Sequence, residues 1–137
     1  MRPTEIEKQL YNGLHGTHIE QLTVDYLART AEFRLQVLVP IDDSDPNSKS
    51  RFRKGHFRVT GVAFLSAEVP DPHYHFMGGP AIEVGGLLDT PSKICPQIAE
   101  LQRELGNSYF FHSLFVEEWN GFVHFAGTDA SFEWTED

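Results

Sequence analysis

Cysteine is nearly absent from this chain, in which Cys95 is the only one. A single thiol cannot form an internal disulfide, so no such cross-link is expected to stabilise the fold. Free thiols are typical of proteins in a reducing compartment, and we therefore expect a cytoplasmic location. We interpret Cys95 as a small buried residue near a helix start rather than a reactive thiol, because Lys93 is the one nearby cation that could activate it.

Long apolar runs are missing too. No run approaches the roughly 20 residues that span a bilayer, and the chain starts with the polar and acidic segment Met1–Glu5, where a secretion signal would turn apolar. We therefore expect neither a membrane segment nor secretion.

Positive charge is scarce. Eleven Lys and Arg stand against 20 Asp and Glu, which gives a net charge of −9. Such a chain repels phosphate backbones and attracts basic partners, so we expect no nucleic acid as a partner. Five of the basic residues cluster between positions 49 and 58, directly after the aspartates at 42, 43 and 45. We interpret this segment as a solvated loop that runs into an edge strand, with an anion site as the alternative.

Catalytic motifs are also lacking. No serine lies in a G-x-S-x-G elbow, and the glycine pairs at 78–79 and 85–86 match no phosphate-binding loop. Asp43 resembles the start of a calcium loop, but Ser48 and Lys54 replace its required glycine and bidentate glutamate. We therefore expect a protein that is not an enzyme and that has no cofactor.

The residues that are present indicate one domain, 1–137, because 137 residues suffice for a single hydrophobic core. Hydrophobic residues make up 40% of the chain and charged ones 23%, as in ordinary globular proteins. The 11 phenylalanines favour a core rich in β-strands.

Two helices are predicted. Thr4 and Glu7 form a capping box that predicts a short helix from about Glu5 to Asn12, stopped by the following glycine. A longer helix starts near Pro96 and ends at Gly106. Its apolar stripe, at steps of four, three and four, comprises Ile94, Ile98, Leu101 and Leu105.

Alternating apolar residues predict the strands. Two alternating runs around an Ala28-Arg29-Thr30 turn predict a hairpin, and the polar stretch Pro40–Ser50 predicts a loop after it. The next strand is expected from about Gly55 to Glu68, with a bulge at Gly61. A short strand near Ala81–Leu88 is expected after a loop from Pro70 to Pro80.

The last hairpin is predicted from the dipeptide Asn120-Gly121, which tolerates the positive φ angles of a two-residue turn. It pairs roughly Tyr109–Trp119 with Phe122–Trp134. This register places Trp119 opposite Phe122 and Glu117 opposite His124. Both faces of the hairpin are apolar enough to be covered, one of them by the longer helix.

The same register brings titratable groups and aromatic rings to one place. We expect Trp119, Phe122, Glu117 and His124 to form an interaction surface. A simple cross-strand ion pair between Glu117 and His124 is the structural alternative, because such pairs commonly stabilise sheets.

Seven histidines are many for this length. His73 and His75 share one side of an extended segment, and His15 and His18 could join them, but neither spacing matches a known metal class, so we expect no metal. A pocket lined by His73, Tyr74 and His75 remains the alternative site, which would serve a small ligand, a metal or an enzyme substrate.

Two segments carry a family resemblance. The run Leu14–Ile19, which leads into Leu22–Tyr26 and a second alternating strand, resembles the start of small bacterial domains of unknown function, some of them classed as immunity proteins of polymorphic toxin systems. The closing hairpin around Trp119-Asn120-Gly121 is also similar to theirs. Those domains usually have Asp after the Leu-His pair, where this chain has Gly16. The resemblance implies a non-enzymatic cytoplasmic protein that binds a partner.

We therefore predict an α+β fold: a mostly antiparallel sheet of about five or six strands built from hairpins, one main helix packed on a face and a short N-terminal helix. The expected function is binding through an acidic surface, either to a protein partner or to a second copy in a homodimer. A small-ligand-binding, metal-binding or enzymatic role near residues 70–80 is the alternative.

Overall fold

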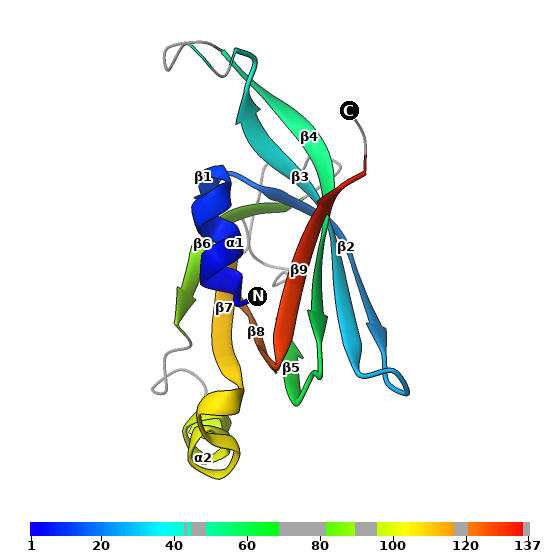
Figure 1. Cartoon of the computed structure of the whole chain (residues 1–137), viewed down its shortest axis with the longest axis vertical. Coiled ribbons are helices and arrows are strands. Elements are labelled where there is room, and N and C mark those ends of the chain that lie inside the picture. Colours follow the sequence, from blue (N-terminus) through cyan, green and yellow to red (C-terminus); the bar gives the residue numbers. More distant parts are fainter. Residues whose placement is uncertain (43, 45–48, 69–81, 90–95, 117–120, 136–137) are drawn as a thin grey trace, which may run out of the picture.

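The computed structural model describes residues 1–42, 44, 49–68, 82–89, 96–116 and 121–135 (Figure 1). Helices and strands follow one another within these residues. They are α1 (Pro3–Gln9), β1 (Tyr11–Leu14), β2 (His18–Asp25), β3 (Thr30–Pro40), β4 (Ser50–Thr60), β5 (Phe64–Ala67), β6 (Ile82–Asp89), α2 (Pro96–Leu105), the 3-10 helix η1 (Gly106–Ser108), β7 (Phe110–Val116), β8 (Gly121–Gly127) and β9 (Asp129–Trp134).

Eight strands form one antiparallel sheet in the order β5-β8-β7-β6-β2-β3-β4-β9. β5 and β9 are the two ends of this order, yet β5 directly follows β4 in the chain and β9 directly follows β8. The sheet therefore curls round its own core. β6 joins the two halves by pairing with both β2 and β7. The predicted α+β class and antiparallel pairing are confirmed, whereas the expected number of five or six strands is wrong.

The additional strands arise at a shared corner. Gly61, where a bulge was predicted inside one strand, instead ends β4 with a φ of 61°, a conformation that glycine adopts without steric cost. β8 and β9 break beside it at Thr128, whose backbone N–H donates to the Thr60 carbonyl at 3.0 Å. A Cβ on Gly61 would collide with the Thr128 side chain. The β4–β5 and β8–β9 segments therefore bend together, which turns two expected strands into four.

The β2/β3 hairpin forms as predicted. β2 pairs with β3 from His18 opposite Gln36 to Asp25 opposite Thr30. β3 and β4 then extend as a projecting hairpin (Figure 1). The polar loop predicted between Pro40 and Ser50 falls largely on residues 43 and 45–48, which lie outside the described residues. The strand expected near Ala81–Leu88 is also present, as β6.

The longer helix is confirmed as α2, and Gly106 with a φ of 68° follows its last residue. The short helix lies earlier than predicted, because Arg2 and not Thr4 is its N-cap. The Arg2 backbone N–H donates to the Glu5 carboxylate at 2.7 Å, so Glu5 takes the role that was expected of Glu7. Leu10 is the C-cap of this helix, and Tyr11 and Asn12, which were expected to complete it, belong to β1 instead.

The core centres on three phenylalanine rings. Phe33, Phe57 and Phe125 are fully buried, with ring centroids 5.7–6.0 Å apart. Ile6 of α1 adds its side chain to this cluster. On the other face of the β7/β8 hairpin, Ile98 of α2 packs with residues of both strands. Both faces of this hairpin are covered, one of them by the long helix, as predicted.

Candidate functional site

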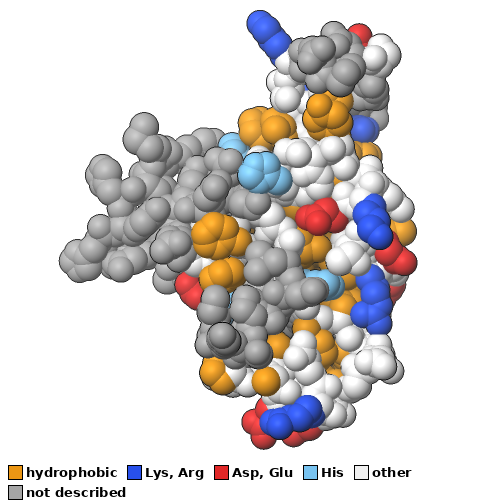
Figure 2. Space-filling model, turned by 90° about the vertical axis from the view of Figure 1, so that its left-hand side faces the viewer, with side chains coloured by type: hydrophobic (Ala, Val, Ile, Leu, Met, Phe, Trp, Pro, Cys, Tyr) orange, Lys and Arg blue, Asp and Glu red, His pale blue; other side chains and the backbone are white. Residues whose placement is uncertain are grey.

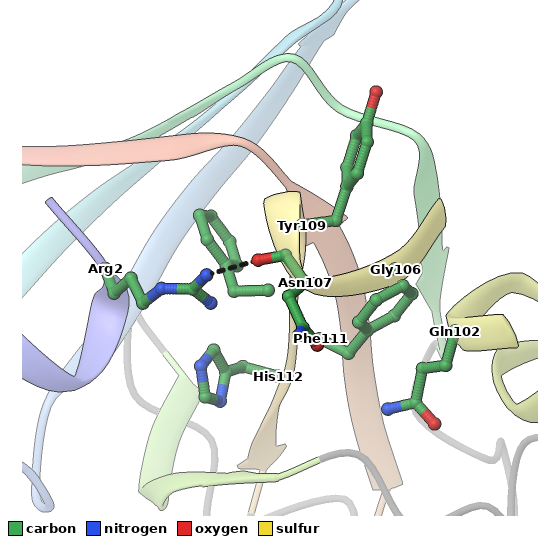
Figure 3. Close-up of a pocket in the computed structure, with 8 residues that line it drawn as sticks. Arg2, Gln102, Gly106, Asn107, Tyr109, Phe111 and His112 are labelled. Atoms are coloured by element: carbon green, nitrogen blue, oxygen red, sulfur yellow. Dashed lines mark hydrogen bonds between the residues drawn. The ribbon is translucent and has the colours of Figure 1, made fainter. Parts of the chain in front are cut away.

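A cleft lies where the start of α1, the α2–η1 turn and the start of β7 meet (Figure 3). Its volume is about 400 Å³. The positive φ of Gly106 turns the chain from α2 into η1 and brings both to this cleft. The described residues that line it are Arg2, Gln102, Gly106, Asn107, Tyr109, Phe110, Phe111 and His112.

Arg2 reaches from the start of α1 to η1 at one side of the cleft. Its guanidinium Nη2 donates to the backbone carbonyl of Asn107 at 2.7 Å, a contact between residues 105 positions apart in the chain. The backbone of Arg2 is held at the same time, because its carbonyl accepts from the N–H groups of Glu5 and Ile6 at 3.0 and 3.3 Å. Arg2 is therefore exposed to solvent but anchored at both its backbone and its charged end.

His112 forms another wall and comes from β7. Alternation along this strand puts it on the same face as Phe110 and Leu114, which belong to the main core. The imidazole is 7% exposed and stacks on the Phe110 ring, with centroids 5.8 Å apart and planes 29° apart. Its ring points into the cleft, as does the Gln102 amide, while the Tyr109 hydroxyl points away (Figure 3).

The cleft combines polar groups with an aromatic wall. A guanidinium, an imidazole and an amide approach from α1, β7 and α2, and Phe110 and Phe111 supply apolar surface. No Asp or Glu is among its described lining residues, although acidic and basic side chains lie interspersed on the face shown in Figure 2. The local chemistry of the cleft thus differs from the acidic character of the whole chain, and it suits a small molecule with hydrogen-bond acceptors.

A separate buried pair lies on the opposite face of β7 and β8. Ser113 and His124 are directly opposite each other, and Ser113 Oγ lies 2.5 Å from His124 Nδ1. These residues are 0% and 3% exposed. The hydrogen bond satisfies two polar groups that would otherwise be costly to bury.

This pairing corrects the predicted register. Val116 pairs with Gly121, so the connection is the four residues 117–120 rather than the two-residue turn Asn120-Gly121. Each β8 residue therefore faces a β7 residue four positions earlier than expected, and His124 lies opposite Ser113 instead of Glu117. Alternation cannot distinguish registers that differ by an even number, because the same side chains stay on the same face.

Burial lowers the pKa of His124 from its ordinary value of 6.5, and the carboxylate of Glu68 opposes this shift. The folded protein therefore favours the neutral imidazole. Protonation favours the unfolded chain, so the stabilisation that depends on a neutral His124 is complete above pH 6.5 and declines as the pH falls below it.

We expect the free energy of unfolding to fall as the pH drops below 6.5, with a slope from His124 of at most about 1.4 kcal/mol per pH unit. Urea unfolding of the wild type and His124→Gln at several pH values measures this slope. The variant should lose part of the pH dependence. Equal slopes for the wild type and His124→Gln would contradict this role.

The structure describes two of the residues predicted as sites, Phe122 and His124, and leaves the others undescribed. Phe122 is partly buried, with its ring 5.3 Å from both Phe115 and His124, and His124 is interior rather than at the surface. Glu117 and Trp119 lie outside the described residues, as do His73, Tyr74 and His75, so both the proposed surface and the proposed pocket stay predictions.

The remaining metal candidates do not converge in the described part of the chain. His15 is exposed, and the His18 ring contacts that of Phe52, with centroids 4.4 Å apart and planes tilted by 35°. No group of three or more His, Cys, Asp or Glu side chains able to hold a metal ion occurs among the residues whose positions are described.

The sequence analysis did not single out the cleft residues. Arg2, Gln102 and His112 belong to no motif, and their proximity depends on how the sheet closes. One local signal was present: His112 interrupts the apolar face that Phe110, Leu114 and Val116 otherwise form. A polar side chain on the core face of a strand indicates either a buried hydrogen bond or a site.

Comparisons of the chain with protein-family models, with curated proteins and with solved structures find no match. Within the described residues, neither helix has the length and apolar character needed to cross a membrane. Function must therefore be argued from the geometry of the chain itself.

Proposed function

We propose that this chain is a non-enzymatic binding domain that holds a small molecule in the cleft between α1, η1 and β7. One observation carries the proposal: polar side chains from distant parts of the chain, Arg2, Gln102 and His112, converge on a cavity of about 400 Å³ with an aromatic wall. Concave sites with a few convergent polar groups on an apolar surface are the usual form of ligand pockets.

Binding is preferred to catalysis because of where the nucleophile candidate lies. The Ser113–His124 pair has the residue types of a nucleophile and its base. Ser113 is fully buried, however, and neither residue is among those that line the cleft. The pair is explained by the hydrogen bond that it makes across two strands.

A cleft-filling substitution tests the proposal. Gln102 is exposed on α2 with its amide directed into the cleft, so Gln102→Trp should occupy the cavity without changing the core. Among neutral, cationic and anionic metabolites screened by NMR, we expect ligands that shift the signals of Asn107 and His112 and bind at least about tenfold more weakly to the variant, a loss of about 1.4 kcal/mol.

Arg103→Trp provides the control, because Arg103 is the exposed neighbour on the same helix and does not line the cleft. It should leave binding unchanged. Ligands that bind equally to Gln102→Trp and the wild type, or a screen with no cleft ligand at concentrations of about 1 mM, would contradict the proposal.

A protein-interaction role is the second candidate, favoured by the tip of the β2/β3 hairpin. Tyr26 is 87% exposed and Leu27 is fully exposed, and neighbouring apolar side chains of this kind mark contact surfaces. Affinity capture with wild-type and Leu27→Ser baits tests this role. A partner, or untagged copies of the chain, retained by the wild type and lost with Leu27→Ser would support it, and equal retention would exclude this tip as the contact.

A further inference from the structure

We infer that the ligand of the cleft carries an oxyanion, a carboxylate or a phosphate group, which Arg2 binds, and this inference rests on the proposed function. Three features of the described residues lead to it: a guanidinium that pairs with none of their carboxylates, its fixed position, and a set of lining residues that includes no Asp or Glu.

The hydrogen-bond partner of the Arg2 guanidinium is a neutral carbonyl. The chain contains 20 acidic side chains, yet among the described residues the Arg2 guanidinium makes no ion pair and one hydrogen bond, to the Asn107 carbonyl. The nearby Glu5 carboxylate accepts from the Arg2 backbone N–H instead. A guanidinium has five N–H donors, so most of its donor capacity and all of its charge are available to a ligand.

The guanidinium is also held where a ligand can reach it. Helix-capping hydrogen bonds fix the Arg2 backbone, and the Met1 carbonyl accepts from the Ala130 N–H at 2.7 Å, which ties the same segment to β9. The contact with Asn107 then fixes the far end of the side chain. A planar fork of donors that is already positioned loses less entropy on binding and matches the two oxygens of a carboxylate or phosphate.

The other described lining residues favour the same charge. The Gln102 amide points into the cleft and makes no hydrogen bond with the described residues, so its N–H groups can donate to a second oxygen. The His112 imidazole faces the same space (Figure 3). With no described carboxylate in the lining, an anion meets donors here, whereas a cation would meet the unpaired charge of Arg2.

Three small aromatic probes separate the charge from the aromatic contact. Benzoate, phenyl phosphate and the neutral benzamide each place a ring against Phe110 and Phe111, and only the first two carry an oxyanion. The experiment is an NMR titration of isotope-labelled protein that starts at Met1 and carries any tag after Asp137, because Arg2 lines the cleft and Met1 ties the same segment to β9. We expect benzoate, phenyl phosphate or both to shift the Arg2, Asn107 and His112 signals, and benzamide to bind at least about tenfold more weakly. The anion that binds more tightly shows whether the oxyanion of the ligand is a carboxylate or a phosphate.

Substitutions at Arg2 then test its role. Arg2→Gln should weaken binding of the anion at least about tenfold, to the level of benzamide, and Arg2→Lys, which keeps the charge but loses the fork, should give an intermediate affinity. Arg103→Gln, with the same charge change on exposed α2, should have no effect. Thermal unfolding verifies that each variant is folded. If Arg2→Gln does not fold, the affinity of Arg2→Lys decides the test.

Failure of this inference differs from failure of the proposed function. If benzamide binds as well as benzoate, or if only neutral or cationic ligands sensitive to Gln102→Trp are found, the cleft is a binding site that does not select oxyanions. If the Arg2 variants bind the anions unchanged, Arg2 is not the residue that binds the oxyanion. If no ligand of any charge binds in the cleft, both are wrong.

Discussion

Phe125→Ala is expected to lower the free energy of unfolding by about 3–5 kcal/mol. Phe125 is fully buried, and its ring lies 5.9 Å from that of Phe33, 6.0 Å from Phe57 and 6.3 Å from Phe110. Alanine would remove the contacts of one ring with three others and leave a cavity between the two halves of the curled sheet. The surrounding strands are paired on both sides and can relax little into that space.

Phe52→Ala is the matched control, because Phe52 is 40% exposed at the projecting β3/β4 hairpin. It should lose its ring contact with His18 and lower the free energy of unfolding by about 1 kcal/mol or less. Urea unfolding followed by tryptophan fluorescence measures both variants. Similar losses for the two would show that Phe125 is not the centre of the core. Because Phe110 belongs to the same cluster and lines the cleft, Phe125→Ala should also weaken ligand binding at the cleft.

Local patterns predicted the elements whose partners are close in the sequence. In β2 and β3, alternation and a short turn determine which side chains face the core, and the observed pairs agree. In α2, the apolar stripe around Ile98 and Leu101 predicts the face that packs on β7 and β8, and the helix lies as expected. In both cases the information lies within some 20 consecutive residues of the chain.

The remaining features depend on residues far apart in the sequence. The bend at Gly61 exists because the β4–β5 and β8–β9 segments bend together, which no pattern around Gly61 alone reveals. The β7/β8 register differs from the predicted one by four residues, a shift that leaves every side chain on its expected face. The cleft requires Arg2 to meet Asn107 from the opposite end of the chain, and only the closed sheet brings them together.

Gly127→Ala is expected to destabilise the protein by about 1–3 kcal/mol, because it overpacks the corner at which the sheet closes. A Cβ at this position would lie 2.5 Å from Val59 Cγ1 and 2.8 Å from the Thr60 carbonyl oxygen. That carbonyl accepts hydrogen bonds from the backbone N–H and the hydroxyl of Thr128 at 3.0 and 3.3 Å. It cannot move away from the added Cβ without breaking these bonds. The strain must therefore fall on the β4–β9 pairing or on the Val59 side chain.

A double-mutant cycle separates these two sources of strain. If Val59 Cγ1 causes part of the collision, Gly127→Ala should cost at least about 0.5 kcal/mol less in a Val59→Ala background than in the wild type. Gly106→Ala, at a glycine with nothing within 4 Å of the added Cβ, should be additive with Val59→Ala. A fully additive cycle at Gly127 would place the whole cost on the backbone. The close approach of β8 to the Thr60 carbonyl would then limit the size of the side chain at position 127. The same limit affects the position of Phe110, because its ring lies 3.4 Å from a Cβ at that position and forms a wall of the cleft.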